Sequence, residues 1–337
     1  MHICHIIASY GTGGMEGHIV TLCNALSETH QVSVLAPPWF KGKFSDRVRV
    51  VPVSGLLGSR FSPFVRFSLW RQLHRLNPDV VHAHGGKAAR FLATPFLFDH
   101  FKRVATVHGV KSRCSFLRQF DGIISVSKVV AEQLGNIPSD IILNGVAHAG
   151  KFPTGSAVTH NPKRVIAVGR LAPVKGFDVL LNAWAHVKEA QLTLVGDGPE
   201  RHALETLAGK LKINDRVVFA GFRSDVPALL ADSDLVVFSS RREGMPLVFA
   251  EALHVRRQVV STAVGGMRDL LPPEFLVPPE NPTALAAAIN HALDNWDAGT
   301  AQFEPLWEMA QKELTIEAMT EKTAAVYARI LAPRRAS

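Results

Sequence analysis

The amino-acid sequence predicts an α/β protein made of two doubly wound domains that face each other across a cleft. Short runs rich in β-branched residues alternate with helical patterns along the 337 residues, which is typical of βαβ units and parallel sheets. Several runs, such as 164–168 and 235–238, are nearly continuously apolar, as strands buried on both faces are. A stretch rich in Gly, Ala, Pro, Ser and Thr at 145–162 separates two halves of similar pattern and predicts a linker.

In the first half, seven short apolar runs bounded by turn residues are predicted to be strands. They are 2–8, 31–36, 48–53, 79–83, 103–108, 122–126 and 140–143. Residues 60–76 mix basic and bulky apolar side chains and have the pattern of a helix from Pro63 onward. Such a helix either packs its Leu/Phe face on the sheet or lies on an anionic membrane surface.

The second half contains six further runs that predict strands. They are 163–168, 190–195, 215–220, 234–239, 257–262 and 274–278. A long helical pattern from about 305 to 332 ends the chain. We predict a first domain at 1–150, a second domain at 151–317, and a terminal helix at about 318–337 that packs back on the first domain. Ligands are expected beyond the carboxyl ends of the strands in sheets of this kind.

Composition is that of a folded globular protein, with 47% hydrophobic and 20% charged residues. Cys4, Cys23 and Cys114 are odd in number and widely spaced, so we expect small core residues in a reducing cytoplasm rather than disulfides or a metal motif. The first residues have the pattern of a strand, not of a signal peptide, and no apolar run approaches the roughly 20 residues of a membrane span. We therefore expect a cytoplasmic protein, either in solution or peripheral on the membrane.

The charge is unevenly distributed along the chain. Residues 1–150 hold 16 Lys and Arg against 8 Asp and Glu, whereas the remainder holds 21 of each sign, so the net charge of +8 lies in the first half. This asymmetry predicts that the first half meets an anionic partner. Nucleic acid is not favoured, because the sequence has no aromatic–basic repeat or recognition motif.

Two loops that follow strands suit phosphate groups. Residues 11–17 form a glycine-rich turn before a helix, where backbone N–H groups can meet phosphate or sugar, although a plain tight turn explains the pattern equally well. It is not a dinucleotide fingerprint, because Glu16 holds the place of the third glycine. In 169–176, Arg170 and Lys175 flank a turn that leads into a helix, an arrangement suited to a diphosphate, or else a solvated basic turn.

Three histidines are predicted at the ligand end of the first sheet. His82 and His84 share one face of a strand, and His108 ends another. Hydrogen-bonded histidines are favoured over a metal site, because no carboxylate or third histidine follows at ligand spacing.

Two glutamates, Glu243 and Glu251, bracket a segment in which Pro246 is predicted to open a helix, since proline is tolerated in a first helical turn. Glu251 lies on an otherwise apolar helix, where a carboxylate is costly to bury without a hydrogen-bond partner. A sugar diol is one such partner. The alternatives are solvent, or an ion pair with Arg256 or Arg257.

In combination, these motifs resemble those of the retaining glycosyltransferases of family four, which have the GT-B fold of two Rossmann-like domains. The resemblance is carried by segments whose order and spacing match along most of the chain. They are Gly13-Gly14-Met15-Glu16, 79–84, Thr106-Val107-His108-Gly109, Val126-Ser127, Asn144-Gly145-Val146, Val168-Gly169-Arg170, Lys175-Gly176, 196–199, 221–226, Glu243-x7-Glu251 and Gly265-Gly266.

The resemblance implies a role for each matching position. Glu251 would bind nucleotide ribose, Arg170 and Lys175 would neutralise the departing diphosphate, and His108 would contact the donor sugar. Glu243 would address donor sugar and phosphate. The other substrate-binding positions implied are Gly13, Gly14, Glu16, His84, Gly221, Phe222, Arg223, Met245, Pro246 and Leu247.

The implied reaction moves a sugar from a nucleotide diphosphate to a hydroxyl of a glycan or glycolipid with retention of configuration. The resemblance implies no cofactor and no metal ion, and we expect the chain to have no Asp-x-Asp motif that holds a metal. The basic first half is expected to take an anionic acceptor of the cell envelope, such as a lipopolysaccharide core. The alternatives are a nucleotide-sugar 2-epimerase on the same fold and a sugar-binding module without chemistry.

Overall fold

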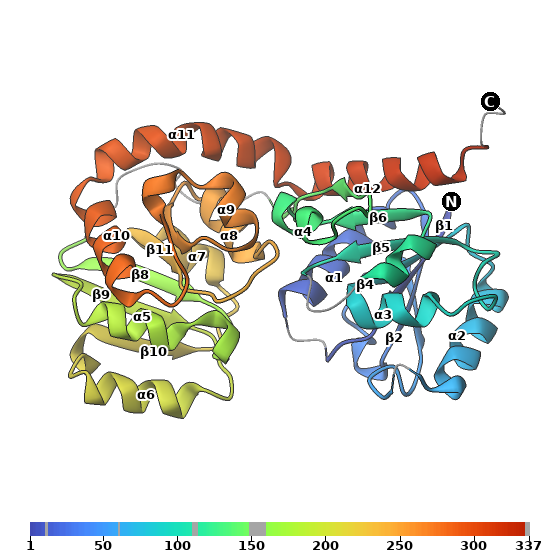
Figure 1. Cartoon of the computed structure of the whole chain (residues 1–337), viewed down its shortest axis with the longest axis horizontal. Helices are drawn as coiled ribbons and strands as arrows, with labels where there is room; N and C mark the ends of the chain where they lie inside the picture. The colour runs from blue at the N-terminus through green and yellow to red at the C-terminus, as the bar shows by residue number, and fades with distance from the viewer. Residues whose placement is uncertain (11–12, 60, 110–113, 148–159, 334–337) are drawn as a thin grey trace. The chain divides into compact units, whose positions relative to one another are not determined.

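The structure is a computed structural model that describes residues 1–10, 13–59, 61–109, 114–147 and 160–333. It contains two compact units, one formed by Met1–Gly145 with Thr315–Ser337 and the other by Val146–Leu314 (Figure 1). Most of the predicted linker, 148–159, lies outside the described residues.

The first unit has a seven-stranded sheet in the order β3-β2-β1-β4-β5-β6-β7, in which every neighbouring pair is parallel. All seven predicted strands are confirmed, with ends within two residues of those expected. They are β1 His2–Ile7, β2 Gln31–Ala36, β3 Val48–Pro52, β4 Val80–His84, β5 Lys102–Val107, β6 Gly122–Ser125 and β7 Asp140–Ile141.

Helices pack on both faces of this sheet. They are α1 Gly14–Leu26, α2 Pro63–Leu76, α3 Gly85–Leu92, α4 Lys128–Gln133 and α12 Ile316–Leu331. The helix α12 comes from the far end of the chain and joins α1 in the core of the first unit. Its Tyr327 and Val326 are buried with Ile19 and Leu22 of α1. The core of the first unit is therefore completed by residues that follow the whole second unit in sequence.

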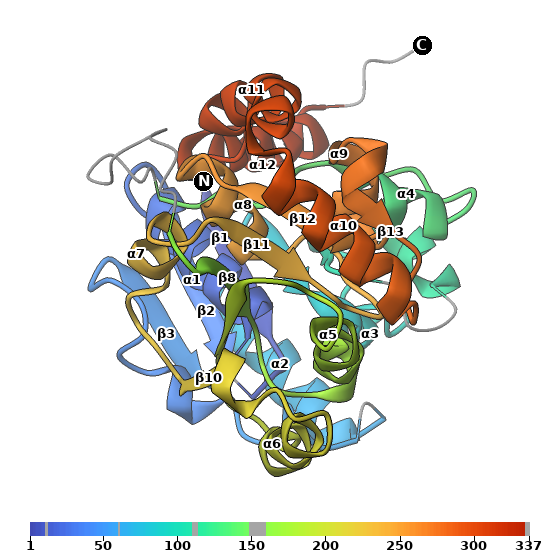
Figure 2. The same ribbon diagram turned by 90° about the vertical axis from the view of Figure 1, so that its left-hand side faces the viewer.

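The second unit has a six-stranded parallel sheet in the order β10-β9-β8-β11-β12-β13. The six predicted strands are confirmed as β8 Lys163–Val168, β9 Ala190–Val195, β10 Val217–Gly221, β11 Leu235–Phe238, β12 Gln258–Thr262 and β13 Leu276–Val277. The helices are α5 Phe177–Trp184, α6 Arg201–Lys210, α7 Val226–Ala231, α8 Leu247–His254, α9 Gly265–Leu270, α10 Pro282–Asp294 and α11 Trp296–Glu313. Figure 2 shows α5 and α10 on one side of this sheet and α7 and α8 on the other.

Both sheets have the strand order of a doubly wound fold. In each, order reverses beside the first strand, between β1 and β4 in one sheet and between β8 and β11 in the other. Ligands of such sheets bind beyond the carboxyl ends of the strands at this reversal, because the connections on either side leave in opposite directions. The predicted fold class of two doubly wound parallel sheets is confirmed.

Two local predictions were wrong. The pattern at 305–332 is not one helix: α11 ends at Glu313, and α12 starts after Thr315, whose side chain accepts a hydrogen bond of 3.1 Å from the N–H of Ala318. A side-chain N-cap of this kind satisfies a terminal N–H group and starts a new helix. Pro246 is the N-cap of α8 rather than its first helical residue, because its backbone is extended.

Candidate functional site

The strongest constellation in the second unit lies at the reversal between β8 and β11. Lys175 comes from the loop after β8 and Glu243 from the loop after β11. The Lys175 Nζ and Glu243 Oε1 atoms are 2.6 Å apart, and the Ser240 hydroxyl donates to the same oxygen at 2.7 Å. Both charged side chains are mostly covered, with 22% and 13% of their surface exposed. An ion pair therefore joins the two loops where a ligand of this sheet is expected.

A second basic group holds the same two loops together. The Arg241 guanidinium donates to both Asp178 carboxylate oxygens, at 2.8 and 2.7 Å, and also pairs with Glu280. The Arg241 N–H donates to the Val174 carbonyl at 2.9 Å. The hydrogen bonds from Arg241 lower the pKa of the Asp178 carboxyl. Arg241 was missed from the sequence, because its two carboxylate partners, Asp178 and Glu280, lie 63 and 39 residues away.

Glycines let the loops at this edge approach one another closely. A Cβ atom on Gly196 would lie 2.0 Å from the Gly169 carbonyl oxygen, and one on Gly265 would lie 2.4 Å from that of Gly244. No larger residue fits at either position. The loops after β8, β9, β11 and β12 are thus tied into one continuous rim.

The remaining predicted residues of the second unit lie along or near this rim. Arg170 is exposed after β8 and has no hydrogen bond or ion pair to the described residues. Gly221 ends β10, and its carbonyl accepts from the Gly196 N–H at 2.8 Å. Phe222 is 82% exposed, whereas Arg223 pairs with its neighbour Asp225 at 2.6 Å.

Glu251 lies in the second turn of α8 and is partly buried. Its carboxylate has no hydrogen bond or ion pair to any residue that the structure describes. The suggested partners are engaged elsewhere, since Arg256 pairs with Glu304 and Arg257 donates to the Ala231 carbonyl at 2.5 Å. Burial raises the pKa of the Glu251 carboxyl. The carboxylate therefore has unused hydrogen-bonding capacity. Met245 is buried, and Pro246 and Leu247 are partly exposed at the start of the same helix.

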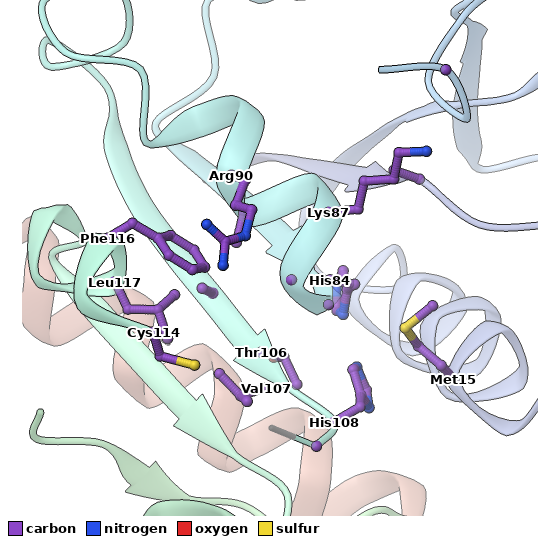
Figure 3. A pocket seen from close by; sticks show the side chains of 17 residues that line it. Met15, His84, Lys87, Arg90, Thr106, Val107, His108, Cys114, Phe116 and Leu117 are labelled. Atoms are coloured by element: carbon purple, nitrogen blue, oxygen red, sulfur yellow. The ribbon is translucent and has the colours of Figure 1, made fainter. Parts of the chain in front are cut away.

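The first unit contains a pocket of about 670 Å³ at the carboxyl ends of β4 and β5. Figure 3 shows His84 and His108 beside Met15 at one end of it, with Arg90 and Phe116 at the other. The Arg90 guanidinium lies 4.3 Å from the centre of the Phe116 ring. The pocket thus combines apolar walls with basic groups, which suits an anionic ligand that has apolar parts.

Further lining residues include Lys87 and Cys114. Cys114 is only partly buried, so the expectation of a core cysteine is confirmed for Cys4 and Cys23 but not for Cys114. Lys87 was missed, although its place just beyond a strand end was visible in the sequence. Its Nζ donates to the Leu57 carbonyl, and burial lowers the pKa of the Lys87 ammonium.

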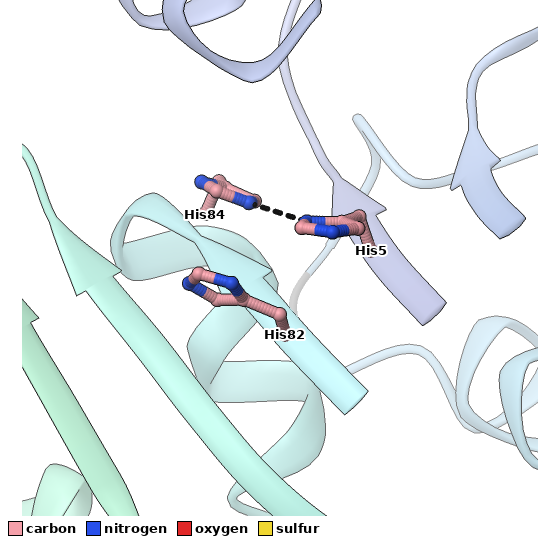
Figure 4. Close-up of side chains that lie close together, drawn as sticks. All are labelled: His5, His82 and His84. Atoms are coloured by element: carbon pink, nitrogen blue, oxygen red, sulfur yellow. Dashed lines mark hydrogen bonds between the residues drawn. The ribbon is translucent and has the colours of Figure 1, made fainter. Parts of the chain in front are cut away.

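Five histidines, His5, His18, His82, His84 and His108, gather at this edge of the sheet and are called the histidine cluster below. His5 Nδ1 and His84 Nε2 are 2.9 Å apart (Figure 4). His82 bonds the Tyr327 hydroxyl at 2.5 Å and the Thr106 hydroxyl at 2.7 Å. The prediction that His82 and His84 are hydrogen-bonded histidines is confirmed.

Burial governs the charge of the histidine cluster. It lowers the pKa of His5 to about 3 and that of His18 to about 4, although the Asn144 side chain acts in the opposite direction and raises the pKa of His18. Burial also lowers the pKa values of the other three rings well below the usual value. The cluster is therefore uncharged at neutral pH. His5 and His18 were missed, because they reach the others only through the strand order.

The first loop is described from Gly13 onward. Gly13 is the N-cap residue of α1, Gly14 begins the helix, and Glu16 lies in its first turn. A Cβ atom on Gly13 would lie 2.8 Å from Glu16 Oε2, so the glycine makes room for that carboxylate. Residues 11–12 of the loop lie outside the described residues.

The chain contains one Asp-x-Asp sequence, Asp232-Ser233-Asp234. Asp234 Oδ2 accepts from the Arg164 N–H at 2.7 Å and lies 3.1 Å from His160 Nδ1, while Asp232 pairs with the Arg164 guanidinium at 2.7 Å. These carboxylates precede β11, at the end of the strand away from the rim, and they tie β8 to β11.

Comparison with known proteins gives matches over most of the chain. Residues 162–295 match the family "Glycosyl transferases group 1", and residues 12–149 match "Glycosyltransferase Family 4". The lipopolysaccharide core biosynthesis glycosyltransferase LpsE of Rhizobium meliloti is 30% identical over 279 residues, which are 76% of this chain and 79% of LpsE. The corresponding enzyme LpsD of the same organism is 26% identical over 313 residues, 88% of this chain and 89% of LpsD.

Among solved structures, Anabaena Alr3699/HepE in complex with UDP and glucose superposes on this chain with a TM-score of 0.82 at 21% identity. The superposition covers 98% of this chain and 100% of the other. It shows a shared fold.

Proposed function

The chain belongs to the family-four glycosyltransferases of group 1 and has their GT-B fold, and on this premise we propose that it transfers a sugar from a nucleotide diphosphate to an envelope glycan or glycolipid with retention of configuration. The observation that carries the proposal is the Lys175–Glu243 pair at the strand reversal of the second sheet. A fixed cation at this place meets the diphosphate of a nucleotide bound beyond the strand ends.

Charge stabilisation by Arg170 and Lys175 is the main catalytic contribution of the second unit. The bond from the anomeric carbon to the diphosphate breaks as the acceptor hydroxyl attacks, and negative charge grows on the departing phosphate. Arg170 is exposed without a partner among the described residues and can turn towards the phosphate, whereas Lys175 is held in place by Glu243, so its ammonium does not have to be repositioned during the reaction. Preorganised groups of this kind lower the barrier because they cost no reorganisation at the moment of reaction. The step is proposed to need no metal ion.

Glu251 is proposed to bind the ribose hydroxyls of the donor. Its carboxylate is partly buried, lacks a partner among the described residues, and accepts hydrogen bonds as a diol would offer them. The exposed Phe222 is proposed to contact the base, and His108 the donor sugar. The relative named above was solved with UDP and glucose, which supports a uridine nucleotide as the first donor to test.

The acceptor is proposed to bind in the pocket of the first unit. Lys87 and Arg90 supply positive charge there, and Phe116 supplies an apolar wall. LpsD and LpsE are both lipopolysaccharide core biosynthesis glycosyltransferases, which supports a lipopolysaccharide core as the acceptor class.

Contact with an anionic membrane surface is proposed for the outer face of α2. Both alternatives weighed for this helix have support, because Leu69 and Leu73 are buried against the unit while Phe64 and Phe67 are 85% and 59% exposed. Phe61, just before the helix, is 67% exposed. No helix in the described part of the chain is both long and apolar enough to span a membrane. A surface of exposed aromatic rings beside arginines suits interfacial binding.

Vesicle sedimentation tests this contact. Neutralising Arg66, Arg71 and Arg75 together is expected to reduce binding to vesicles that contain anionic lipid and to weaken its salt dependence. Unchanged binding and salt dependence would count against the proposal.

The donor site is tested by thermal stabilisation with UDP, GDP, ADP and CMP, with and without EDTA. One nucleotide is expected to raise the Tm of the wild type regardless of EDTA, and Glu251→Ala is expected to lose the shift. No shift with any nucleotide would refute the donor assignment. Product analysis with and without acceptor then separates transfer from 2-epimerisation, because an epimerase converts the donor alone.

A further inference from the structure

Three members of the histidine cluster surround a common point at the wall of the first unit's pocket. The ring centres of His18 and His108 are 4.8 Å apart, and that of His84 lies 5.9 Å from each of them. One nitrogen from each ring lies within 4.8 Å of the other two. Zn–N bonds of about 2.0–2.1 Å in a tetrahedral site place imidazole centres about 5 Å apart, so small ring rotations bring all three nitrogens into bonding range.

Each of the three rings keeps at least one nitrogen that makes no hydrogen bond of good geometry to a described residue, although the Asn144 side chain interacts with His18. Four ring nitrogens are buried and make no hydrogen bond of good geometry to any described residue. They are Nδ1 of His84, Nε2 of His108 and both ring nitrogens of His18. Buried polar atoms are normally satisfied, and Asn144 accounts for only one of the two His18 nitrogens, so the remaining nitrogens of the three rings need an explanation. Burial keeps the rings uncharged by lowering the pKa values of all three, and the neutral ring is the form that binds a metal.

We propose that His18, His84 and His108 bind one divalent transition-metal ion, with zinc the natural occupant by ligand type. Three imidazoles without a carboxylate suit zinc, nickel or copper, whereas magnesium and calcium require oxygen ligands. The other histidine triplet, His5, His82 and His84, is not chosen. Both nitrogens of His82 are already taken by Tyr327 and Thr106.

The surroundings support His84 as a ligand. When its Nε2–H donates to His5 Nδ1 across 2.9 Å, its Nδ1 keeps the lone pair directed at the metal. A second hydrogen bond of this kind fixes the ring orientation of most metal-binding histidines. Asn144 is near enough to raise the pKa of His18 and offers a similar partner for that ring.

The fourth coordination position is open to a ligand. His84 and His108 both line the pocket, so a metal held by them faces its interior (Figure 3). Three protein ligands and one open position characterise metal sites that take water or a small anion as the fourth ligand. The sequence rule for ligand spacing did not find this site, because its members come from α1, the end of β4 and the residue after β5.

Zinc titration of untagged, metal-free protein by calorimetry tests the proposal, with cobalt absorption in the visible range as a probe of tetrahedral geometry. The wild type is expected to bind one ion per chain, and His108→Gln is expected to weaken binding at least tenfold. His108 is chosen because the residue as a whole is only partly buried, and far-UV circular dichroism verifies the fold of the variant.

The matched control replaces two exposed histidines that lie beside each other, His74 and His100, whose ring centres are 4.6 Å apart. The His74→Gln/His100→Gln variant is expected to keep the binding. No zinc binding by the wild type would overturn the proposal, as would binding that survives His108→Gln but is lost in the control. No donor or acceptor is present, so the outcome does not depend on whether the chain transfers a sugar.

Discussion

Replacing Lys175 by methionine is the most direct test of the rim at β8 and β11. Methionine keeps the apolar stem that packs against Gly169, where a Cβ atom would lie 3.1 Å from Lys175 Cε, and removes only the charge. Glu243 would then retain a single hydrogen bond, from Ser240 at 2.7 Å, in a position where 13% of its side chain is exposed. Leaving a largely buried charged group without its partner costs about 1–3 kcal/mol, so the free energy of unfolding should fall by that amount.

The effect on turnover should be larger than the effect on stability. Removing one preorganised charge from a transition state typically lowers kcat about 100- to 1000-fold. Urea unfolding measures the first quantity, and nucleotide release in the presence of acceptor measures the second. The Glu243→Gln variant and the double variant complete a cycle that isolates the coupling between the two side chains.

The cycle separates a structural role from a catalytic one. If Lys175 only neutralises Glu243, the double variant should recover both stability and turnover. If Lys175 meets the diphosphate, stability should recover in the double variant while kcat stays low. Near-normal turnover in the Lys175→Met variant would refute the reasoning. Near-normal turnover in the Arg170→Ala variant would refute it too.

Three further outcomes follow from other parts of the structure. Burial holds the pKa of His5 at about 3 and that of His18 at about 4, so the unfolded chain binds more protons than the folded chain below about pH 6.5. The free energy of unfolding should therefore fall as the pH falls from about 6.5 towards 4. Urea unfolding at pH 7.5 and at pH 5 measures this free energy, and equal values would contradict the prediction. Tyr327→Phe should lower the free energy of unfolding by about 1–3 kcal/mol, because it leaves His82 Nδ1 unpaired. Tyr10 is exposed, so Tyr10→Phe serves as the control, and equal Tm values for the two variants would refute the prediction. Gly265→Ala should abolish the thermal stabilisation by nucleotide, because the new Cβ atom would lie 2.4 Å from the Gly244 carbonyl oxygen. Gly42 also has a positive φ but lies in open space, so Gly42→Ala should keep the stabilisation. Stabilisation kept in both variants would refute the prediction.

Local patterns alone were enough for the strands and for placing several candidate residues of the second unit at the strand ends. Each predicted strand is present because a buried parallel strand needs a short apolar run, and that requirement is written in consecutive residues. Arg170, Lys175 and Glu243 were identified for the same reason, since each lies in a loop directly after such a run. The roles assigned to them stay predictions.

Partners far apart in the sequence were decided only by the tertiary structure. The order of parallel strands is set by long crossover connections, so nothing local indicated that Lys175 meets Glu243, or that His5 and His18 join His84. Thr315, which divides the terminal helical pattern in two, could have been recognised as an N-cap, but its importance lies in the placement of α12.

Sequence by itself determined two parallel α/β units, the concentration of positive charge in residues 1–150, and which loops follow the strands and hold the candidate site residues. Only the folded chain decided that Tyr327 enters the first core and that the Glu251 carboxylate has no partner among the described residues. It also decided that His84 and His108 each keep a buried ring nitrogen without a hydrogen bond to a described residue. The physical reason is that burial periodicity is a local property of the chain. The satisfaction of buried polar groups depends on which distant segments pack together.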